Sequence, residues 1–211
     1  MVATEKKRAG GRKSTKERLA ELEAMFRSGA HEEARKQNEA AFAEAPKLVA
    51  ALHAAGFEWT KSLDPLLAGI NELSGDQYAI VASVFLQHLE AGLPPLLANS
   101  LLQSLAATKP RSRARPYWAK IASLFLSAAS GEVRDGAAVA LAAIAEPADG
   151  EVVLSWLRDP RFGESRVFFL RALRRLLPPA ERAEVLETLK RDPDLEVECD
   201  RVLRGTAPND G

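Results

Sequence analysis

The chain has 211 residues, of which 46% are hydrophobic and 6% aromatic, and its 29 basic and 29 acidic side chains give a formal net charge of zero. This length allows a substantial core in one elongated domain or two small ones, and the zero net charge gives no reason to expect attraction of the whole molecule to nucleic acid or membranes. The apolar stretches fall short of the roughly 18–20 residues that cross a bilayer, which excludes an integral membrane protein.

Charge is unevenly distributed between the two ends. Residues 1–18 carry seven basic groups against two acidic ones, whereas residues 183–211 carry eight acidic groups against four basic ones. Residues 1–15 have no apolar periodicity, so we predict a disordered basic tail there. We also predict a disordered C-terminus over residues 205–211. The single Cys199 excludes an intramolecular disulfide and, with no secretory apolar segment, predicts a cytoplasmic protein.

Residues 16–108 are predicted to form a helical N-terminal region, either of degenerate repeats or as a separate bundle. A helix over residues 16–27 begins with a capping box, and a second covers residues 32–43. A third is expected to begin at Pro46 and to end at Gly56.

Three further helices are expected in this region. Asp64 is predicted as the N-cap and Pro65 as the first position of a short helix. Residues 76–91 are apolar on nearly every side of a helix, so we expect them to be the central element of this half. The pair Pro94 and Pro95 then opens a helix whose leucines face inward.

The stretch 108–116, TKPRSRARP, contains two prolines and no large apolar side chain, so it is predicted to be a boundary or hinge. Its arginines, Arg111, Arg113 and Arg115, make this hinge cationic. Beyond it, residues 117–131 carry aromatic and aliphatic side chains at helical spacing, which predicts another helix.

The C-terminal part repeats with a period of 32–33 residues. Residues 133–141 overlay residues 165–173 at a shift of 32, and Val197-Glu198 falls in the same place one repeat later. Arg158-Asp159-Pro160 recurs as Arg191-Asp192-Pro193 after 33 residues. The two shifts agree, which favours a stack of similar helical units.

This pattern resembles the HEAT-repeat family and its relatives among bacterial phycobilin-lyase-type repeats. Residues 192–197 match the turn between repeats, and residues 133–141 match the first helix of a repeat. The resemblance covers about residues 131–204 and implies an all-α fold, an α-solenoid of HEAT-like helix pairs over residues 109–204. Glu198 stands where the family usually has arginine, and the second unit is one residue longer. Both departures weaken the case for the family's ladder of Asp–Arg pairs.

No residue set predicts a catalytic, cofactor-binding or metal site. His31, His53 and His88 lie on different predicted helices without other ligands at suitable spacing. Cys199 is predicted to be an inert core residue, because its acidic neighbours oppose formation of a thiolate. The carboxylates fall mainly on polar helix faces, and there is no Gly-rich phosphate loop.

The arginines are the better candidates for a binding site. On a helix predicted over residues 164–177, one face is apolar and carries Phe169, Leu170, Leu173, Leu176 and Leu177. The opposite face is predicted to bind a partner through Arg171, Arg174, Arg175, Phe168 and Val167. Exposed aromatic side chains bordered by arginine are typical of protein interfaces. The alternative is that the arginines only keep the helix soluble.

These patterns predict a non-enzymatic interaction module, a scaffold that binds a protein partner along a helical-repeat surface. The alternative is nucleic-acid binding through the N-terminal tail and the hinge arginines Arg111, Arg113 and Arg115, where contacts to phosphates would dominate. A weaker hypothesis is a HEAT-like enzyme of the lyase or DNA glycosylase type, since such folds also carry enzymes.

Overall fold

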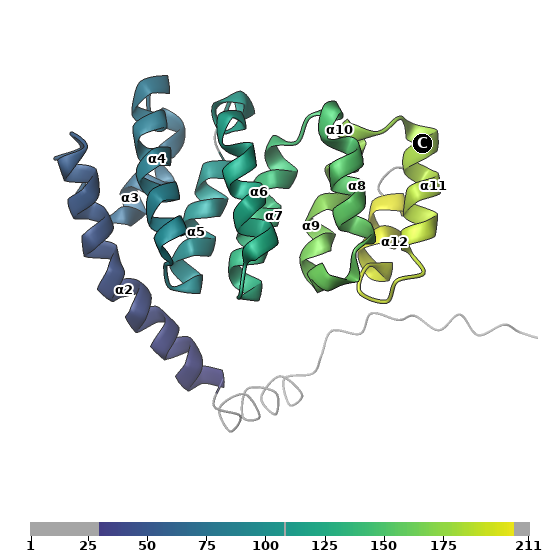
Figure 1. Cartoon of the computed structure of the whole chain (residues 1–211), viewed down its shortest axis with the longest axis horizontal. Helices are drawn as coiled ribbons and strands as arrows, with labels where there is room; N and C mark the ends of the chain where they lie inside the picture. The colour runs from purple at the N-terminus through teal and green to yellow at the C-terminus, as the bar shows by residue number, and fades with distance from the viewer. Residues whose placement is uncertain (1–29, 108, 205–211) are drawn as a thin grey trace, which may run out of the picture. The chain divides into compact units, whose positions relative to one another are not determined.

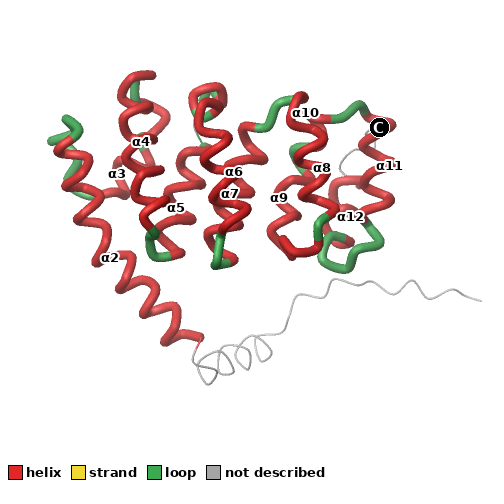
Figure 2. Tube along the Cα trace, viewed as in Figure 1, coloured by secondary structure: helices red, strands yellow, loops and turns green. Residues whose placement is uncertain are grey.

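The computed structural model describes residues 30–107 and 109–204, and every regular element in these ranges is an α-helix or a 3-10 helix (Figure 1). The all-α prediction is therefore confirmed for the described part of the chain, where Figure 2 shows helices joined by short loops. The predicted tail over residues 1–15, the helix over residues 16–27 and the C-terminus over residues 205–211 lie outside the described residues.

A single helix, α2 (Ala30–Ala54), stands where two helices were predicted. The prediction that one helix covers residues 32–43 and that another starts at Pro46 is wrong, because Pro46 lies inside α2. A proline inside a helix costs roughly 3 kcal/mol. The following turns contain Leu48 and Leu52, both fully buried, and burying one leucine contributes roughly 1.5–3 kcal/mol. Core packing therefore outweighs the proline.

The short helix α3 (Leu63–Ala68) begins two residues earlier than predicted, with Ser62 rather than Asp64 as its N-cap. The helix start at Leu63 places both Leu63 and Leu66 in the core, which explains the shift. Asp64 lies in the first turn, where a carboxylate interacts favourably with the helix dipole.

The helices α4 (Gly75–Ala91) and α5 (Pro95–Ala106) confirm the predictions made for this part of the chain. Ser74 and Gln77 form a reciprocal capping box at the start of α4. Gly92 ends α4 with a φ of 91°, a conformation that glycine adopts without steric cost. The buried residues of α4 are Tyr78, Val81, Ala82, Phe85, Leu86 and Leu89.

The segment predicted as a boundary or hinge contains two short 3-10 helices, η2 (Arg111–Arg113) and η3 (Arg115–Tyr117). The guanidinium of Arg113 donates to the carbonyl of Leu73 at 2.8 Å. Arg115 donates two hydrogen bonds to the carboxylate of Asp149, at 2.5 and 2.9 Å. Two of the three hinge arginines thus connect this segment to elements on either side of it.

The remaining elements are α6 (Trp118–Ser127), α7 (Gly131–Ile144), η4 (Pro147–Asp149), α8 (Gly150–Arg158), η5 (Pro160–Arg166), α9 (Val167–Leu170), α10 (Leu173–Leu176), α11 (Pro179–Leu189) and α12 (Glu196–Arg204). The helix predicted over residues 164–177 is divided among η5, α9 and α10. Arg171 and Ala172, between α9 and α10, keep right-handed helical dihedral angles. The predicted apolar face is confirmed in its buried members, Phe169, Leu170, Leu173 and Leu176.

The chain divides into two compact units, Met1–Glu39 and Ala40–Gly211, and within the second the helices from α4 to α12 stand side by side (Figure 1). Helix α7 packs against α5, α6 and α9. A Cβ atom added to Gly136 of α7 would lie 2.9 Å from the Cα of Asn99 in α5. The missing side chain therefore permits the close approach of these two helices.

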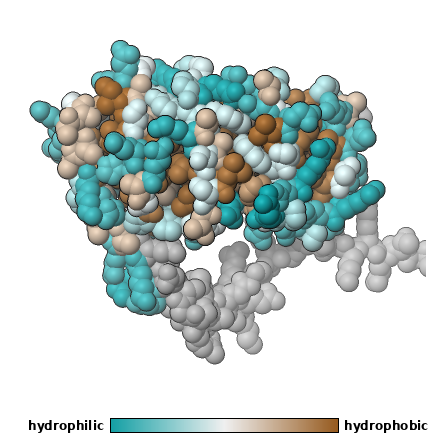
Figure 3. All heavy atoms as spheres, in the orientation of Figure 1, coloured by the Kyte–Doolittle hydropathy of each residue, from teal (hydrophilic) through white to brown (hydrophobic). Residues whose placement is uncertain are grey.

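Aromatic side chains gather between α6, α8 and the segment 160–170. Trp118 stacks on Trp156 with ring centroids 6.0 Å apart, and Phe125 lies 4.7 Å from Phe162 and 5.4 Å from Phe169. Five aromatic side chains, four of them buried, thus pack together at this junction. On the outer face drawn in Figure 3, hydrophilic and hydrophobic side chains form a mosaic.

One arginine forms ion pairs with two aspartates in the next sequence period, although the sequence weakened the case for a ladder of Asp–Arg pairs. The guanidinium of Arg166, 1% exposed, donates to Asp192 at 2.6 Å and to Asp194 at 2.9 Å. Arg134, one period earlier, donates instead to the carbonyl of Ala128. The described residues therefore contain one such link, between η5 and the turn before α12.

Candidate functional site: an arginine-lined groove

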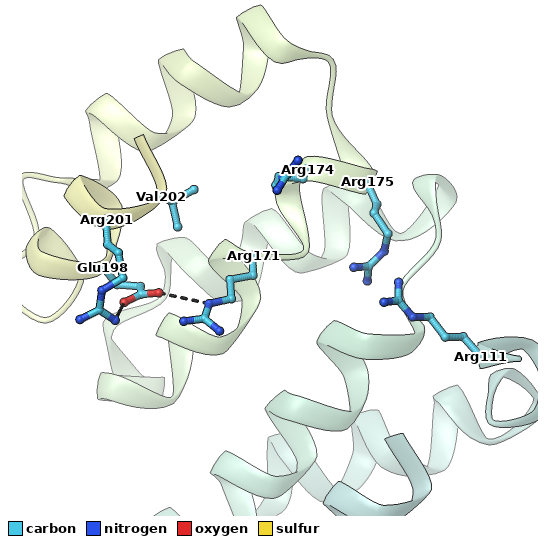
Figure 4. Close-up of a pocket in the computed structure, with 7 residues that line it drawn as sticks. All are labelled: Arg111, Arg171, Arg174, Arg175, Glu198, Arg201 and Val202. Carbon is cyan, nitrogen blue, oxygen red and sulfur yellow. Dashed lines mark hydrogen bonds and ion pairs between the residues drawn. The ribbon is translucent and has the colours of Figure 1, made fainter. Parts of the chain in front are cut away.

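The main candidate site is an open hollow of about 570 Å³ in the second compact unit (Figure 4). We call it the arginine groove, and its lining residues are Arg111, Arg171, Arg174, Arg175, Arg201, Glu198 and Val202. They come from η2, from the segment around α10 and from α12. Segments that are far apart in the sequence thus bring five guanidinium groups to one surface.

Helix geometry explains why the arginines around α10 reach this surface. Leu173 and Leu176 are buried, so the residues between them, Arg174 and Arg175, are directed outward. Arg171 follows the buried Leu170 and has a 74% exposed side chain. The predicted separation of an apolar face from an arginine face is therefore present.

Among the described residues that line the groove, Glu198 is the only one with a carboxylate. It accepts a hydrogen bond from Nε of Arg171 at 3.3 Å and another from Nη1 of Arg201. Its side chain is 13% exposed, whereas those of Arg171 and Arg201 are 74% and 63% exposed. Glu198 therefore forms the floor of this part of the groove, with an arginine on each side (Figure 4).

Arg175 is held by backbone carbonyls rather than by an acid. Its Nη2 donates to the carbonyls of Ala142 and Ala143, at 2.5 and 3.3 Å, in the last turn of α7. Burial, and then the positive charge of Arg111, lower the pKa of Arg175 from its usual value. The arginine remains charged, and the lowered pKa indicates that its charge lies in an unfavourable environment.

The side chains of Arg111 and Arg174 form no hydrogen bond or ion pair with another described residue. Together with Arg175 they place three positive charges in the groove without a carboxylate partner in residues 30–107 and 109–204. Like charges at close range oppose each other, and residues with a perturbed pKa, as Arg175 has here, concentrate at functional sites. The groove is therefore suited to bind an anion.

Val167 and Phe168 do not line the groove, and their predicted part in binding a partner stays a prediction. Both side chains are partly buried and pack against the hydrophobic core, and neither lines the groove. The reason is that α9 packs against α7, α8 and α12, which leaves little of its surface free. The predicted arginines Arg171, Arg174 and Arg175 do lie together.

Sequence reasoning missed Glu198, Arg201 and Val202, which α12 brings to the groove. One signal was present, because Glu198 occupies the repeat position held by Arg134 and Arg166. When one unit has a negative charge where the other units have a positive one, its side chain at that position must interact with different groups. Of the three hinge arginines, only Arg111 lines the groove.

The other candidates have ordinary structural surroundings. His53 lies 2.5 Å from the carbonyl of Thr60, His88 is partly buried on α4, and the side chain of His31 is outside the described residues. Cys199 is fully buried, and burial, followed by the charges of Asp200 and Glu198, raises the pKa of its thiol to about 11. This confirms the predicted core position of Cys199.

Across residues 30–107 and 109–204, no group of three or more His, Cys, Asp or Glu residues is arranged to hold a metal ion. In the same ranges, no helix combines the length and apolar character needed to span a bilayer.

Comparisons with known proteins add no relative: no protein-family model, no curated protein and no solved structure matches the chain.

Proposed function

We propose that the chain is a non-enzymatic interaction module, an α-solenoid of HEAT-like helix pairs, that binds an acidic segment of a protein partner in the arginine groove. The observation that carries the proposal is the convergence of five arginines, from three chain segments, around one carboxylate. The link from Arg166 to Asp192 and Asp194 supports the repeat architecture, because it joins one sequence period to the turn that begins the next.

The chemistry of the lining supports binding rather than catalysis. Guanidinium groups supply positive charge and several hydrogen-bond donors, and they recognise carboxylates and phosphates by paired hydrogen bonds. The one carboxylate, Glu198, already accepts from Arg171 and Arg201, so it is poorly placed to take a proton from a substrate.

The distribution of charge favours a protein over a nucleic acid. Beside the groove-lining helix α12 runs α11, whose exposed side chains include Glu181, Glu184 and Glu187. A duplex presents one charge per roughly 1.7 Å of its axis and needs an extended basic track. A short acidic peptide needs only a local patch, which is what the described surface provides.

A second candidate, nucleic-acid binding, is favoured by Arg111. This hinge residue lines the same groove as the arginines near α10, so the positive patch is larger than either cluster alone. Binding of this kind would weaken steeply as salt concentration rises.

The test is an affinity capture with nuclease present, followed by direct binding of the purified partner. Changing Arg171, Arg174 and Arg175 to Gln should abolish binding. A matched control changes Lys61, Arg158 and Arg191 to Gln, because these residues are also exposed and the same charge is lost. Equal binding by both triple variants, or binding that nuclease removes, would contradict the proposal.

A further inference from the structure

The arginine groove has two parts that differ in charge balance. In one part, Arg171 and Arg201 share the carboxylate of Glu198, so two positive charges meet one negative charge. The other part contains Arg111, Arg174 and Arg175, which have no carboxylate partner among the described residues. We call the second part the uncompensated subsite. Its three positive charges favour an anion that carries more than one negative charge.

Arg175 is held in position for an incoming ligand. Its Nη2 is occupied by the carbonyls of Ala142 and Ala143, whereas its Nε and Nη1 have no hydrogen-bond partner among the described residues. In Figure 4 the guanidinium groups of Arg111 and Arg175 are directed toward each other. A donor group that is already fixed loses less conformational entropy when it binds, which favours affinity.

We propose that the uncompensated subsite binds a phosphate monoester, a phosphorylated side chain of the protein partner, and this inference rests on the function proposed above. A phosphate monoester carries a charge of about −1.5 to −2 at neutral pH and offers three acceptor oxygens. It can therefore accept from guanidinium groups that approach from different directions. A carboxylate has one charge and two oxygens in one plane, so it would leave more of the positive charge unbalanced.

Glu198 favours a single phosphate group over a chain of phosphates. The carboxylate lies at the floor of the same groove, and a second anion placed there would have to displace it from Arg171 and Arg201. Val202, which also lines the groove, contributes an apolar side chain to the lining. An isolated phosphorylated side chain meets the subsite without approaching Glu198, whereas a nucleic-acid backbone continues past it.

The first experiment titrates the full chain with three peptides that differ at one position, which is phosphoserine, glutamate or serine. Binding is followed through the arginine Nε–H signals in NMR spectra, which detect weak complexes. The phosphoserine peptide should bind at least about tenfold more tightly than the glutamate peptide. Equal affinity of these two peptides, or no shift of the Arg111, Arg174 and Arg175 signals at millimolar concentrations, overturns the inference.

The variant Arg111→Gln with Arg174→Gln should abolish the preference for the phosphoserine peptide. Neither side chain makes a hydrogen bond or ion pair with another described residue, so the fold should stay intact and the melting temperature should change little. The matched control changes Arg158 and Arg191, both exposed, to Gln and should keep the preference. An equal loss in the control means that general charge, not the subsite, is responsible, and this overturns the inference.

Two further measurements separate the phosphate inference from the proposed function. A captured partner that binds the chain equally well after phosphatase treatment, yet not after the Arg171, Arg174 and Arg175 change, upholds the interaction module and overturns the phosphate inference. A single-stranded oligonucleotide that binds more tightly than the phosphoserine peptide, with a strong dependence on salt, overturns both. Loss of partner binding after phosphatase treatment supports both.

Discussion

Arg166 and Asp192 connect the end of η5 with the turn that precedes α12, at a distance of 2.6 Å between Nη1 and Oδ2. The two partners differ in their exposure to water. The arginine side chain is 1% exposed, whereas those of Asp192 and Asp194 are 29% and 44% exposed. Removing the acids would therefore leave a buried positive charge, while removing the arginine would leave carboxylates that water can reach.

We therefore expect the acids to matter more for stability than the arginine. Changing Asp192 and Asp194 together to Asn should lower the free energy of unfolding by about 2–4 kcal/mol, because it leaves the charge of Arg166 unbalanced in the core. Arg166→Met should lower the free energy of unfolding by less, about 1–2 kcal/mol, because this change removes the buried charge itself along with its attraction to the carboxylates. Urea denaturation measures both values, and the reverse order would contradict this explanation.

An exposed ion pair provides the control for these changes. Arg161 is 82% exposed and pairs with Asp159, so Arg161→Met should leave the free energy of unfolding nearly unchanged.

The same pair predicts a dependence of stability on pH. The hydrogen bond from Arg166 lowers the pKa of Asp192 below its usual value. A carboxyl group with a lower pKa in the folded state stabilises the fold above the unfolded-state pKa, about 3.9, and loses this effect as the pH falls through the folded-state pKa. The stability difference between the wild type and Asp192→Asn should thus be largest near neutral pH and should shrink below about pH 4. A constant difference across this range would show that the charge of Asp192 contributes nothing.

Gly136→Ala should separate α5 from α7. The new Cβ would lie 2.9 Å from the Cα of Asn99, a backbone atom that cannot move without displacing its helix. We expect a loss of about 1–3 kcal/mol in the free energy of unfolding, measured by urea denaturation. Gly131→Ala is the matched control at the start of the same helix, because no atom lies within 4 Å of the added Cβ. It should leave the stability unchanged or raise it by about 0.4–1 kcal/mol.

The packed and exposed sides of the segment around α10 should respond differently to substitution. Leu173→Ala removes methyl groups that are fully buried, which should cost about 2–5 kcal/mol. Arg171→Gln and Arg174→Gln should each change the stability by only about 0.5 kcal/mol. Arg175→Gln should cost about 0.5–1.5 kcal/mol, because the side chain bonds to carbonyls of α7. Equal effects of Leu173→Ala and Arg174→Gln, measured by thermal or urea denaturation, would contradict the assigned orientation.

The sequence predicted helix boundaries correctly where they depend on the backbone conformation of individual residues. The glycine after α4 and the proline pair before α5 fix those boundaries through backbone conformation, and both lie where the sequence placed them. The buried face with Leu173 at its centre followed from helical spacing alone. In contrast, α2 continues through Pro46 because Leu48 and Leu52 are buried, and burial depends on contacts that the local sequence does not encode.

The arginine groove could be predicted only in part, for the same reason. Arg171, Arg174 and Arg175 share a helical face, so their proximity follows from spacing. The approach of Arg111 depends on how η2 is placed in the fold, and the pairing of Arg171 with Glu198 joins residues 27 positions apart. The partial burial of Val167 and Phe168 depends on the helices that pack against α9, and the local sequence does not encode those contacts.

The stacked indoles of Trp118 and Trp156 give the protein a built-in optical probe. Trp156 is buried and Trp118 is partly buried against the core, whereas the third tryptophan, Trp59, is 56% exposed. Most of the change in fluorescence on unfolding must therefore arise where α6 meets α8. Circular dichroism averages over all helices, so a comparison of the two signals reports whether this junction separates together with the rest of the helices or independently of them.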